Sequence, residues 1–300
     1  MGLGTGEPPA CARSRGFAVN AIARPALRYF GGKWRLAPWL IRLFPSHHVY
    51  TEAFGGGASV LLQKPRSHGE IYNDLDGEVV NVFRVLQDPH KAKRLEALLR
   101  MTPFAREEFD LSYKRSRDDV ERARRTIVRS FMGFGSDSIT RTGRAERRTI
   151  STGFRTNSWR ANTCAAEDWA NYANHIRHFC ARLQGVVIEN RDAMKVIESA
   201  DREDTLHYVD PPYPHDVRKS KSNYRYEMTM EQHRKLADLL HSVKGMVLIS
   251  SYPGPYDDLY RDWNWLSYSG TQFCHGAQER RERVWFNPAA QKRQGAMRLW

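Results

Sequence analysis

The chain has 300 residues and a formal net charge of +13 at pH 7, because 47 Lys and Arg outnumber 34 Asp and Glu. Apolar residues make up 41% and aromatic residues 11% of the chain, a composition that excludes a mostly disordered protein. No apolar run approaches the roughly 20 residues of a membrane span, and we expect no secretory signal in the Gly-, Pro- and Arg-rich start. We therefore expect a cytoplasmic protein that does not bind membranes. The positive charge indicates a polyanionic partner such as nucleic acid.

From about residue 26, short apolar or β-branched runs alternate with longer helical stretches, which is typical of a parallel sheet with crossover helices. The predicted strands cover residues 49–53, 70–73, 186–189, 205–209, 246–250, 263–268 and 284–286. The predicted helices around them cover residues 34–44, 59–63, 78–86, 193–199 and 229–241. Residues 26–87 and 186–287 would form this α/β domain, and residues 1–25 and 288–300 would be tails.

Between residues 88 and 185 this alternation stops, and we predict an inserted, mainly helical domain. Its last helix is predicted over residues 166–183, where apolar residues at spacings of three and four share one helical face: Trp169, Tyr172, Ile176, Phe179 and Leu183. One set of side chains here could be drawn as a zinc site: Cys164, His175, His178 and Cys180. Because Ile176 and Phe179 lie among them and the chain has no CxxC pair, we expect core packing and no metal.

The first motif with chemical content is Tyr29-Phe30-Gly31-Gly32-Lys33, before the first predicted strand. Its two glycines place Lys33 at the start of a predicted helix, where the ammonium and backbone N–H groups could hold a carboxylate. A tight turn with a solvated lysine is the alternative interpretation of these five residues.

The second motif is Phe54-Gly55-Gly56-Gly57, which follows a predicted strand. Three glycines let the backbone approach a ligand closely at a strand-to-helix turn. The third glycine of the dinucleotide fingerprint is missing, and no Lys-Ser/Thr pair follows as in a P-loop. Asp74 ends the next predicted strand 17 residues after Gly57, and an acid at about this distance commonly holds ribose hydroxyls. Asp76 could be that acid instead, or could cap the next helix.

The third motif is Asp210-Pro211-Pro212-Tyr213, directly after a predicted strand. The two prolines end the strand and fix φ at both positions. The Asp210 carboxylate and nearby carbonyls would then project from the carboxyl end of a strand, where ligands bind in open α/β sheets. Together with the ring of Tyr213, these acceptors suit an amino group on a flat ring. An ordinary Pro-Pro turn with a surface tyrosine is the alternative.

In this order, with the insert between the second and third motifs, the sequence resembles the Dam-like family of DNA adenine methyltransferases. These form the alpha group of S-adenosylmethionine-dependent amino-methyltransferases, and the resemblance covers about residues 26–287. Residues 228–233, 247–250 and 282–287 add to it. The sequence departs from the family at Tyr29, where Trp is frequent, and at Ala53, where Pro is common. Outside residues 129–134 the insert matches weakly, which leaves the recognition sequence open.

The resemblance implies a seven-stranded Rossmann-like sheet, S-adenosylmethionine as methyl donor, double-stranded DNA as substrate and no metal. Carried over by position, the cofactor site would consist of Tyr29, Lys33, Phe54, Gly55, Gly57, Asp74, Asp192 and Asp210. Lys33 would take the carboxylate of the methionine part, Asp74 the ribose hydroxyls, and Asp192 would face the adenine. The catalytic residues would be Asp210, Pro211, Pro212 and Tyr213. Family members are typically prokaryotic or phage-encoded, and many belong to restriction–modification systems; we expect a monomer.

The implied reaction is methyl transfer to the exocyclic 6-amino group of a flipped adenine. Asp210 and the carbonyl of Pro211 would accept the two N–H bonds of this amino group and stabilise the positive charge that develops on its nitrogen. Tyr213 would stack on the flipped base.

Positive charge concentrates in two segments. Residues 121–160 contain ten Arg and three acidic residues, a net charge of +7, and residues 215–226 have a net charge of +3. Arginine forks suit phosphates and guanine edges. The predicted DNA-binding residues are Arg129, Arg141, Arg144, Arg147, Arg148, Arg218, Lys219 and Lys221.

Two alternatives stay open at this point. An acid or amide followed by Pro-Pro and an aromatic residue also occurs in RNA and protein amino-methyltransferases, although Asp at position 210 and the basic insert favour adenine in DNA. The second alternative is a DNA-binding protein with an inactive methyltransferase domain. The presence of Lys33, Asp74 and Asp210 argues against it.

Overall fold

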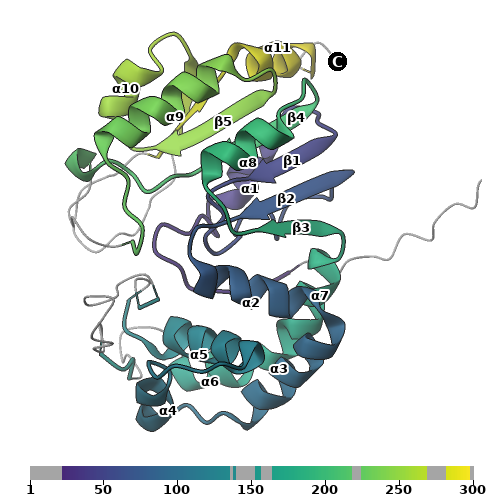
Figure 1. The fold of residues 1–300 in the computed structure, drawn as a ribbon, viewed down its shortest axis with the longest axis vertical. Helices are drawn as coiled ribbons and strands as arrows, with labels where there is room; N and C mark the ends of the chain where they lie inside the picture. Colours follow the sequence, from purple (N-terminus) through teal and green to yellow (C-terminus); the bar gives the residue numbers. More distant parts are fainter. Residues whose placement is uncertain are drawn as a thin grey trace, which may run out of the picture.

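The computed structural model describes residues 22–135, 138–139, 153–156, 164–217, 224–268 and 282–297 (Figure 1). Its centre is a seven-stranded sheet in the order β3-β2-β1-β4-β5-β7-β6. The strands are β1 (Val49–Glu52), β2 (Gly69–Asn73), β3 (Val186–Glu189), β4 (Thr205–Val209), β5 (Met246–Ser251), β6 (Asn264–Ser267) and β7 (Arg283–Phe286). β1 to β5 are parallel, and β7 runs antiparallel between β5 and β6. All seven predicted strands are confirmed.

The chain order along the sheet reverses between β1 and β4. From β1 the sheet extends outward to β2 and β3 on one side, and from β4 to β5 on the other. β1 and β4 pair in register, with Glu52 opposite Tyr208. In open α/β sheets such a reversal leaves a crevice at the carboxyl ends of the strands. Ala53 and Phe54 follow β1 here, and Asp210 follows β4.

Helices cover both faces of the sheet (Figure 1). They are α1 (Ala37–Arg42), α2 (Gly77–Gln87), α8 (Ala193–Ala200), α9 (Met230–Ser242), α10 (Pro255–Leu259) and α11 (Pro288–Met297). The helix predicted over residues 59–63 is a series of turns instead. Two features break the helical pattern: Ala58 has a φ of 52°, and the Leu61 amide donates to the Glu52 carboxylate of β1 at 2.8 Å rather than to a helical carbonyl.

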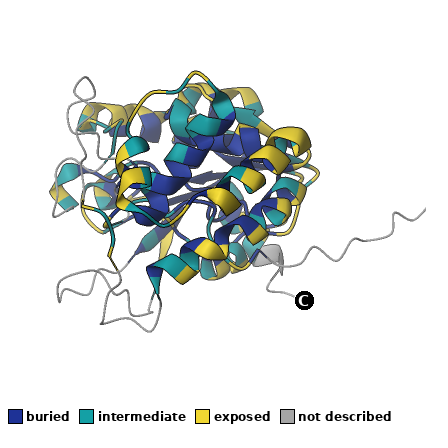
Figure 2. Ribbon diagram, turned by 90° about the horizontal axis from the view of Figure 1, so that it is seen from below, coloured by how far each residue is buried: buried dark blue, intermediate teal, exposed yellow. Residues whose placement is uncertain are grey.

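The predicted insert is helical and packs on the sheet domain through α2. It contains α3 (Pro89–Met101), α4 (Arg106–Leu111), α5 (Asp119–Met132), α6 (Ala165–Ala170), the 3₁₀ helix η1 (Tyr172–His175) and α7 (Ile176–Leu183). The single helix predicted over residues 166–183 is thus broken, and Asn171 at the break donates back to the Glu167 carbonyl. Its five apolar residues are nevertheless all buried. One apolar core runs from the sheet through α2 into these helices, and Figure 2 shows buried residues along their inner faces.

Both predicted tails are wrong at their inner ends. Ile22, within the predicted tail, is buried, and the Arg24 guanidinium lies 4.9 Å from the ring centroids of Phe131 and Tyr172. At the other end, Pro288–Met297 form α11, whose Ala290 is fully buried against the sheet. The sequence of α11 mixes Ala with Gln, Lys and Arg and has no apolar run that would predict a buried helix, yet its small Ala290 packs against the sheet. Residues 1–21 and 298–300 lie outside the described residues.

Candidate active site

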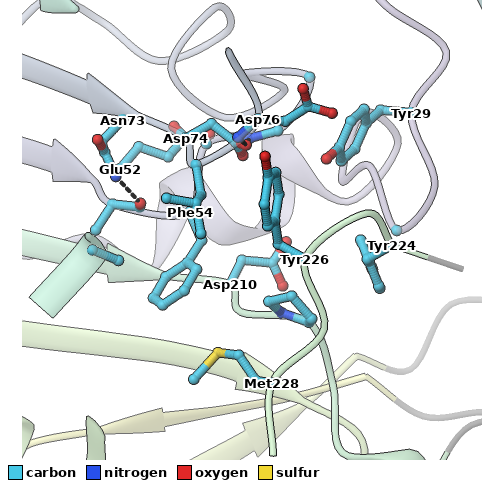
Figure 3. Close-up of a pocket in the computed structure, with 18 of the residues that line it drawn as sticks. Tyr29, Glu52, Phe54, Asn73, Asp74, Asp76, Asp210, Tyr224, Tyr226 and Met228 are labelled. Atoms are coloured by element: carbon cyan, nitrogen blue, oxygen red, sulfur yellow. Dashed lines mark hydrogen bonds between the residues drawn. The ribbon is translucent and has the colours of Figure 1, made fainter. Parts of the chain in front are cut away.

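A pocket opens at the carboxyl edge of the sheet, where β1, β2 and β4 end (Figure 3). All of the residues predicted to bind the cofactor line it: Tyr29, Lys33, Phe54, Gly55, Gly57, Asp74, Asp192 and Asp210. The pocket therefore brings together all three motifs, which span residues 29 to 213 of the chain. Tyr224, Tyr226 and Met228, which lie after the third motif, line it as well.

The glycine turn after β1 is shaped by its neighbours. Gly56 has a φ of +46°, a conformation that L-residues rarely adopt. At Gly55 the constraint is space, because a Cβ would come within 2.2 Å of the Tyr72 ring. That ring is fixed in turn, since the Tyr72 hydroxyl donates to the Gly56 carbonyl at 2.7 Å. The glycines let the backbone form the pocket wall where side chains would clash.

Replacing Gly55 by alanine is therefore expected to lower the free energy of unfolding by about 2 kcal/mol, the usual scale of overpacking a tight site. Chemical denaturation measures this. Gly153→Ala is the matched control, since a Cβ there meets nothing within 4 Å. Equal midpoints for Gly55→Ala and the wild type would contradict the packing described for this turn.

Asp74 and Asp76 lie at the pocket edge after β2, and each is partly engaged by the backbone. Asp74 Oδ2 accepts from the Gly56 amide at 2.9 Å, and its Oδ1 accepts from the Asp76 amide at 2.7 Å. Burial raises the pKa of Asp74 to about 6, against the effect of these bonds. Asp76 caps α2 and pairs with Arg225 at 2.7 Å, while its Oδ2 is buried without a hydrogen-bond partner. Both acids predicted as alternatives for the ribose hydroxyls therefore face the pocket.

Asp192 is exposed and lines the pocket. Its Oδ1 accepts from the Met194 amide at 2.9 Å and from the Lys195 amide at 3.3 Å, which caps α8. A capping role thus accounts for one of its oxygens. The role toward an adenine stays a prediction.

Lys33 and Asp210 form an ion pair at the pocket wall. Lys33 Nζ lies 2.8 Å from Asp210 Oδ2 and 3.6 Å from Glu282 Oε1, and it donates to the Gly31 carbonyl at 2.9 Å. Burial disfavours the charge on Lys33, but Asp210 and Glu282 raise its pKa above the usual value. Asp210 and the Gly31 carbonyl are within hydrogen-bond distance of the ammonium, and Glu282 lies at ion-pair distance, so the geometry does not favour the predicted contact with a cofactor carboxylate. It makes Lys33 the partner of Asp210.

Asp210 keeps one oxygen free of protein partners. Its Oδ1 is buried and accepts no hydrogen bond, although Asp210 lines the pocket. Burial raises the pKa of Asp210, and Lys33 opposes that rise. Because a buried acceptor without a donor is costly, this atom is suited to a donor that arrives with the substrate.

Tyr213 is buried, with 6% of its surface exposed. Its hydroxyl donates to Glu282 Oε1, and its ring lies 4.9 Å from Lys33 Nζ and packs edge-on against Tyr252. In this arrangement Tyr213 packs behind the ion pair. Stacking of Tyr213 on a flipped base stays a prediction.

Two buried carboxyls of the site were not predicted. Glu52 ends β1, lines the pocket and accepts from the Tyr50 hydroxyl and the Leu61 amide, both at 2.8 Å; burial raises its pKa to about 8. Glu282 lies just before β7. The same sequence feature could have indicated both: each acid lies inside or beside an apolar strand, and such a strand is expected to be buried on both faces.

Of the predicted DNA-binding residues, the structure describes only Arg129. Its guanidinium donates to the Ser112 carbonyl at 2.5 Å and to the Thr126 hydroxyl at 2.9 Å, and it lies 5.7 Å from the Tyr113 ring centroid. These contacts give Arg129 a packing role within the helical region. The other seven lie outside the described residues: Arg141, Arg144, Arg147, Arg148, Arg218, Lys219 and Lys221.

Among the described residues, no group of three or more His, Cys, Asp or Glu side chains could hold a metal ion. Ile176 and Phe179, the core residues expected between the two histidines, are buried. No helix in the described part of the chain is long and apolar enough to cross a membrane.

The sheet order, the glycine turn after β1, the acids after β2 and the Asp-Pro-Pro-Tyr after β4 define a methyltransferase of Rossmann-like fold. A family model for D12 class N6 adenine-specific DNA methyltransferases matches residues 29–271, and the chain belongs to this family. The protein is thus an enzyme that methylates adenine in DNA, and DNA is favoured over RNA and protein as acceptor. No curated protein matches the chain.

Proposed function

We propose that the enzyme transfers a methyl group from S-adenosylmethionine to the 6-amino group of an adenine flipped out of double-stranded DNA, at a specific site. The observation that carries this proposal is Asp210 Oδ1, a buried acceptor without a partner at the wall of the pocket. The test offers labelled S-adenosylmethionine together with DNA, RNA and protein acceptors. Label should enter DNA alone, and label in RNA or protein would contradict the proposal.

The pocket suits S-adenosylmethionine in the chemistry of its lining. Asp74 and Asp76 offer carboxylates for ribose hydroxyls, and the buried, unpaired Oδ2 of Asp76 is an acceptor that such a hydroxyl would satisfy. Phe54 and Met228 give apolar surface for a flat ring (Figure 3). The cofactor supplies an electrophilic methyl group on a sulfonium. Tyr29 and the glycines Gly55 and Gly57 would form the wall against which it lies.

The protein's own contribution is to orient the nucleophile. The lone pair of the adenine 6-amino nitrogen is delocalised into the ring, so it is a weak nucleophile. Asp210 Oδ1 and the Pro211 carbonyl would accept its two N–H bonds and stabilise the developing positive charge. Lys33 holds the other oxygen of Asp210 at 2.8 Å, which favours the ionised form that this role needs. The rigid Pro211 and Pro212 keep these acceptors in place.

DNA would be held by the two basic segments, with the enzyme acting as a monomer. Each phosphate contact contributes about 0.9 to the slope of log K against log salt. Charge reversal at two positions, Arg218→Glu with Lys221→Glu, is expected to weaken DNA binding and flatten this slope by about 2. Fluorescence anisotropy over a salt series measures it. The matched control is Arg234→Glu with Lys235→Glu on α9, which should leave the slope unchanged; unchanged affinity in the first pair would count against the segment.

A further inference from the structure

Glu282 is a buried carboxyl that contacts the Lys33–Asp210 ion pair from the start of β7, beyond β5 in the sheet. It directly precedes β7, and 2% of its surface is exposed. It contacts Lys33 Nζ at 3.6 Å and accepts a hydrogen bond from the Tyr213 hydroxyl. Asp210 lines the pocket, whereas Glu282 lies behind it. Glu282 is therefore placed to act on the residues that meet the substrate, and not on the substrate.

Two carboxyls share one ammonium in this cluster. Lys33 lies closer to Asp210, at 2.8 Å, than to Glu282, at 3.6 Å. Burial raises the pKa of Glu282 to about 7, with Lys33 lowering it and Asp210 raising it further. The other titratable groups that face this carboxyl are Tyr213 and Tyr208, and burial raises the pKa of each well above its usual value. A pKa of about 7 means that the charge of Glu282 changes near neutral pH.

The Tyr213 hydroxyl has two possible acceptors. It donates to Glu282, and it is also close enough to Asp210 to lower the pKa of that carboxyl. A phenol has one proton to donate. While Tyr213 donates to Glu282, Asp210 Oδ1 has no partner within the protein. If Glu282 were removed, Asp210 would be the remaining acceptor for the Tyr213 hydroxyl. Its free oxygen would then no longer be available to the substrate amino group.

We propose that Glu282 is a positioning residue for methyl transfer, which holds the Tyr213 hydroxyl and the Lys33 ammonium so that Asp210 Oδ1 stays free for the adenine amino group. This inference rests on the proposed function of Asp210. The ionised form of Glu282 accepts from the Tyr213 hydroxyl and pairs with the Lys33 ammonium, so we expect the turnover number to rise as pH increases through the pKa of Glu282. Affinity for S-adenosylmethionine does not depend on it, because Glu282 lies behind the pocket.

Steady-state methylation of DNA by Glu282→Gln and Glu282→Asp tests this proposal. Glu282→Gln keeps the shape but not the charge, and we expect kcat to fall about 10- to 100-fold at pH 8 with KM for S-adenosylmethionine within about twofold. Its kcat should lack the rise with an apparent pKa near 7 that we expect for the wild type. Glu282→Asp should recover part of the rate and the pH dependence.

Arg283→Gln is the control at the neighbouring position, because Arg283 pairs with Asp257 and stacks on Trp265, outside the cluster. It should keep the wild-type profile. Wild-type kcat and pH dependence in Glu282→Gln would overturn the proposal. Carboxyl-carbon NMR measures the pKa of Glu282 without turnover, and the signal that disappears in Glu282→Gln assigns it. A pKa of Glu282 near the ordinary value of 4.5 would also overturn the proposal. An inactive wild type with the raised pKa present would instead contradict the proposed function.

Discussion

Replacing Asp210 by alanine is expected to reduce kcat for DNA methylation by about 10³-fold or more. Removing one preorganised group that stabilises transition-state charge costs about 10²- to 10³-fold in other enzymes, and Asp210 would in addition orient the nucleophile. DNA binding should be largely spared, since the basic residues are elsewhere. Single-turnover methylation with saturating enzyme measures the chemical step, and anisotropy measures binding.

Two further variants control for this result. Asp210→Asn keeps the shape and one acceptor oxygen but loses the charge that pairs with Lys33, so its rate should lie between those of the alanine variant and the wild type. Asp257→Ala removes a carboxylate whose partner is Arg283, away from the pocket, and should leave the rate unchanged. Near-normal turnover in Asp210→Ala would refute the assignment of this residue.

The largest expected loss of stability is at Glu70, which joins the helical region to the sheet. Arg182 from α7 pairs with it at 2.6 Å, and Lys64 pairs with it at 2.7 Å. All three side chains are at most 3% exposed. Glu70→Gln leaves two buried cations without a carboxylate, which costs about 3–5 kcal/mol. Urea denaturation measures the change in the free energy of unfolding.

Glu96→Gln is the matched control, because Glu96 pairs with Arg100 on the exposed face of α3, and such pairs contribute at most about 1 kcal/mol. The pH dependence gives a second readout. Burial opposes the charge on Glu70, but Arg182 and Lys64 hold its pKa below 4.5. The stabilisation is then complete above pH 4.5 and is lost as pH falls through the folded-state pKa. A loss below 1 kcal/mol in Glu70→Gln would contradict the role of this cluster.

The strands could be predicted from sequence because most are short apolar or β-branched runs bounded by turn residues, and the central parallel strands β4 and β5 are buried on both faces. The helix over residues 59–63 could not, since the Glu52 carboxylate takes the Leu61 amide, and this tertiary contact has no local signal. The break between α6 and α7 could not be predicted either, because the buried apolar face continues through η1 and the sequence pattern shows no interruption there.

The pocket residues could be predicted because they belong to motifs at strand ends, and parallel strands bring their carboxyl ends to one edge. The partners of these residues could not. That Lys33 pairs with Asp210, 177 positions later, depends on the reversal of the strand order between β1 and β4. Glu282 comes from the antiparallel strand β7, whose place beside β5 no local pattern indicates.

The most direct measurement is nucleoside analysis of DNA after incubation with the enzyme and labelled S-adenosylmethionine. Hydrolysis to nucleosides followed by chromatography separates N6-methyladenine from methylated cytosine. Label should appear only as N6-methyl-2′-deoxyadenosine with the wild type and be absent with Asp210→Ala. Label on cytosine, or equal labelling by the two enzymes, would contradict the account of a site in which Asp210 directs methyl transfer to adenine.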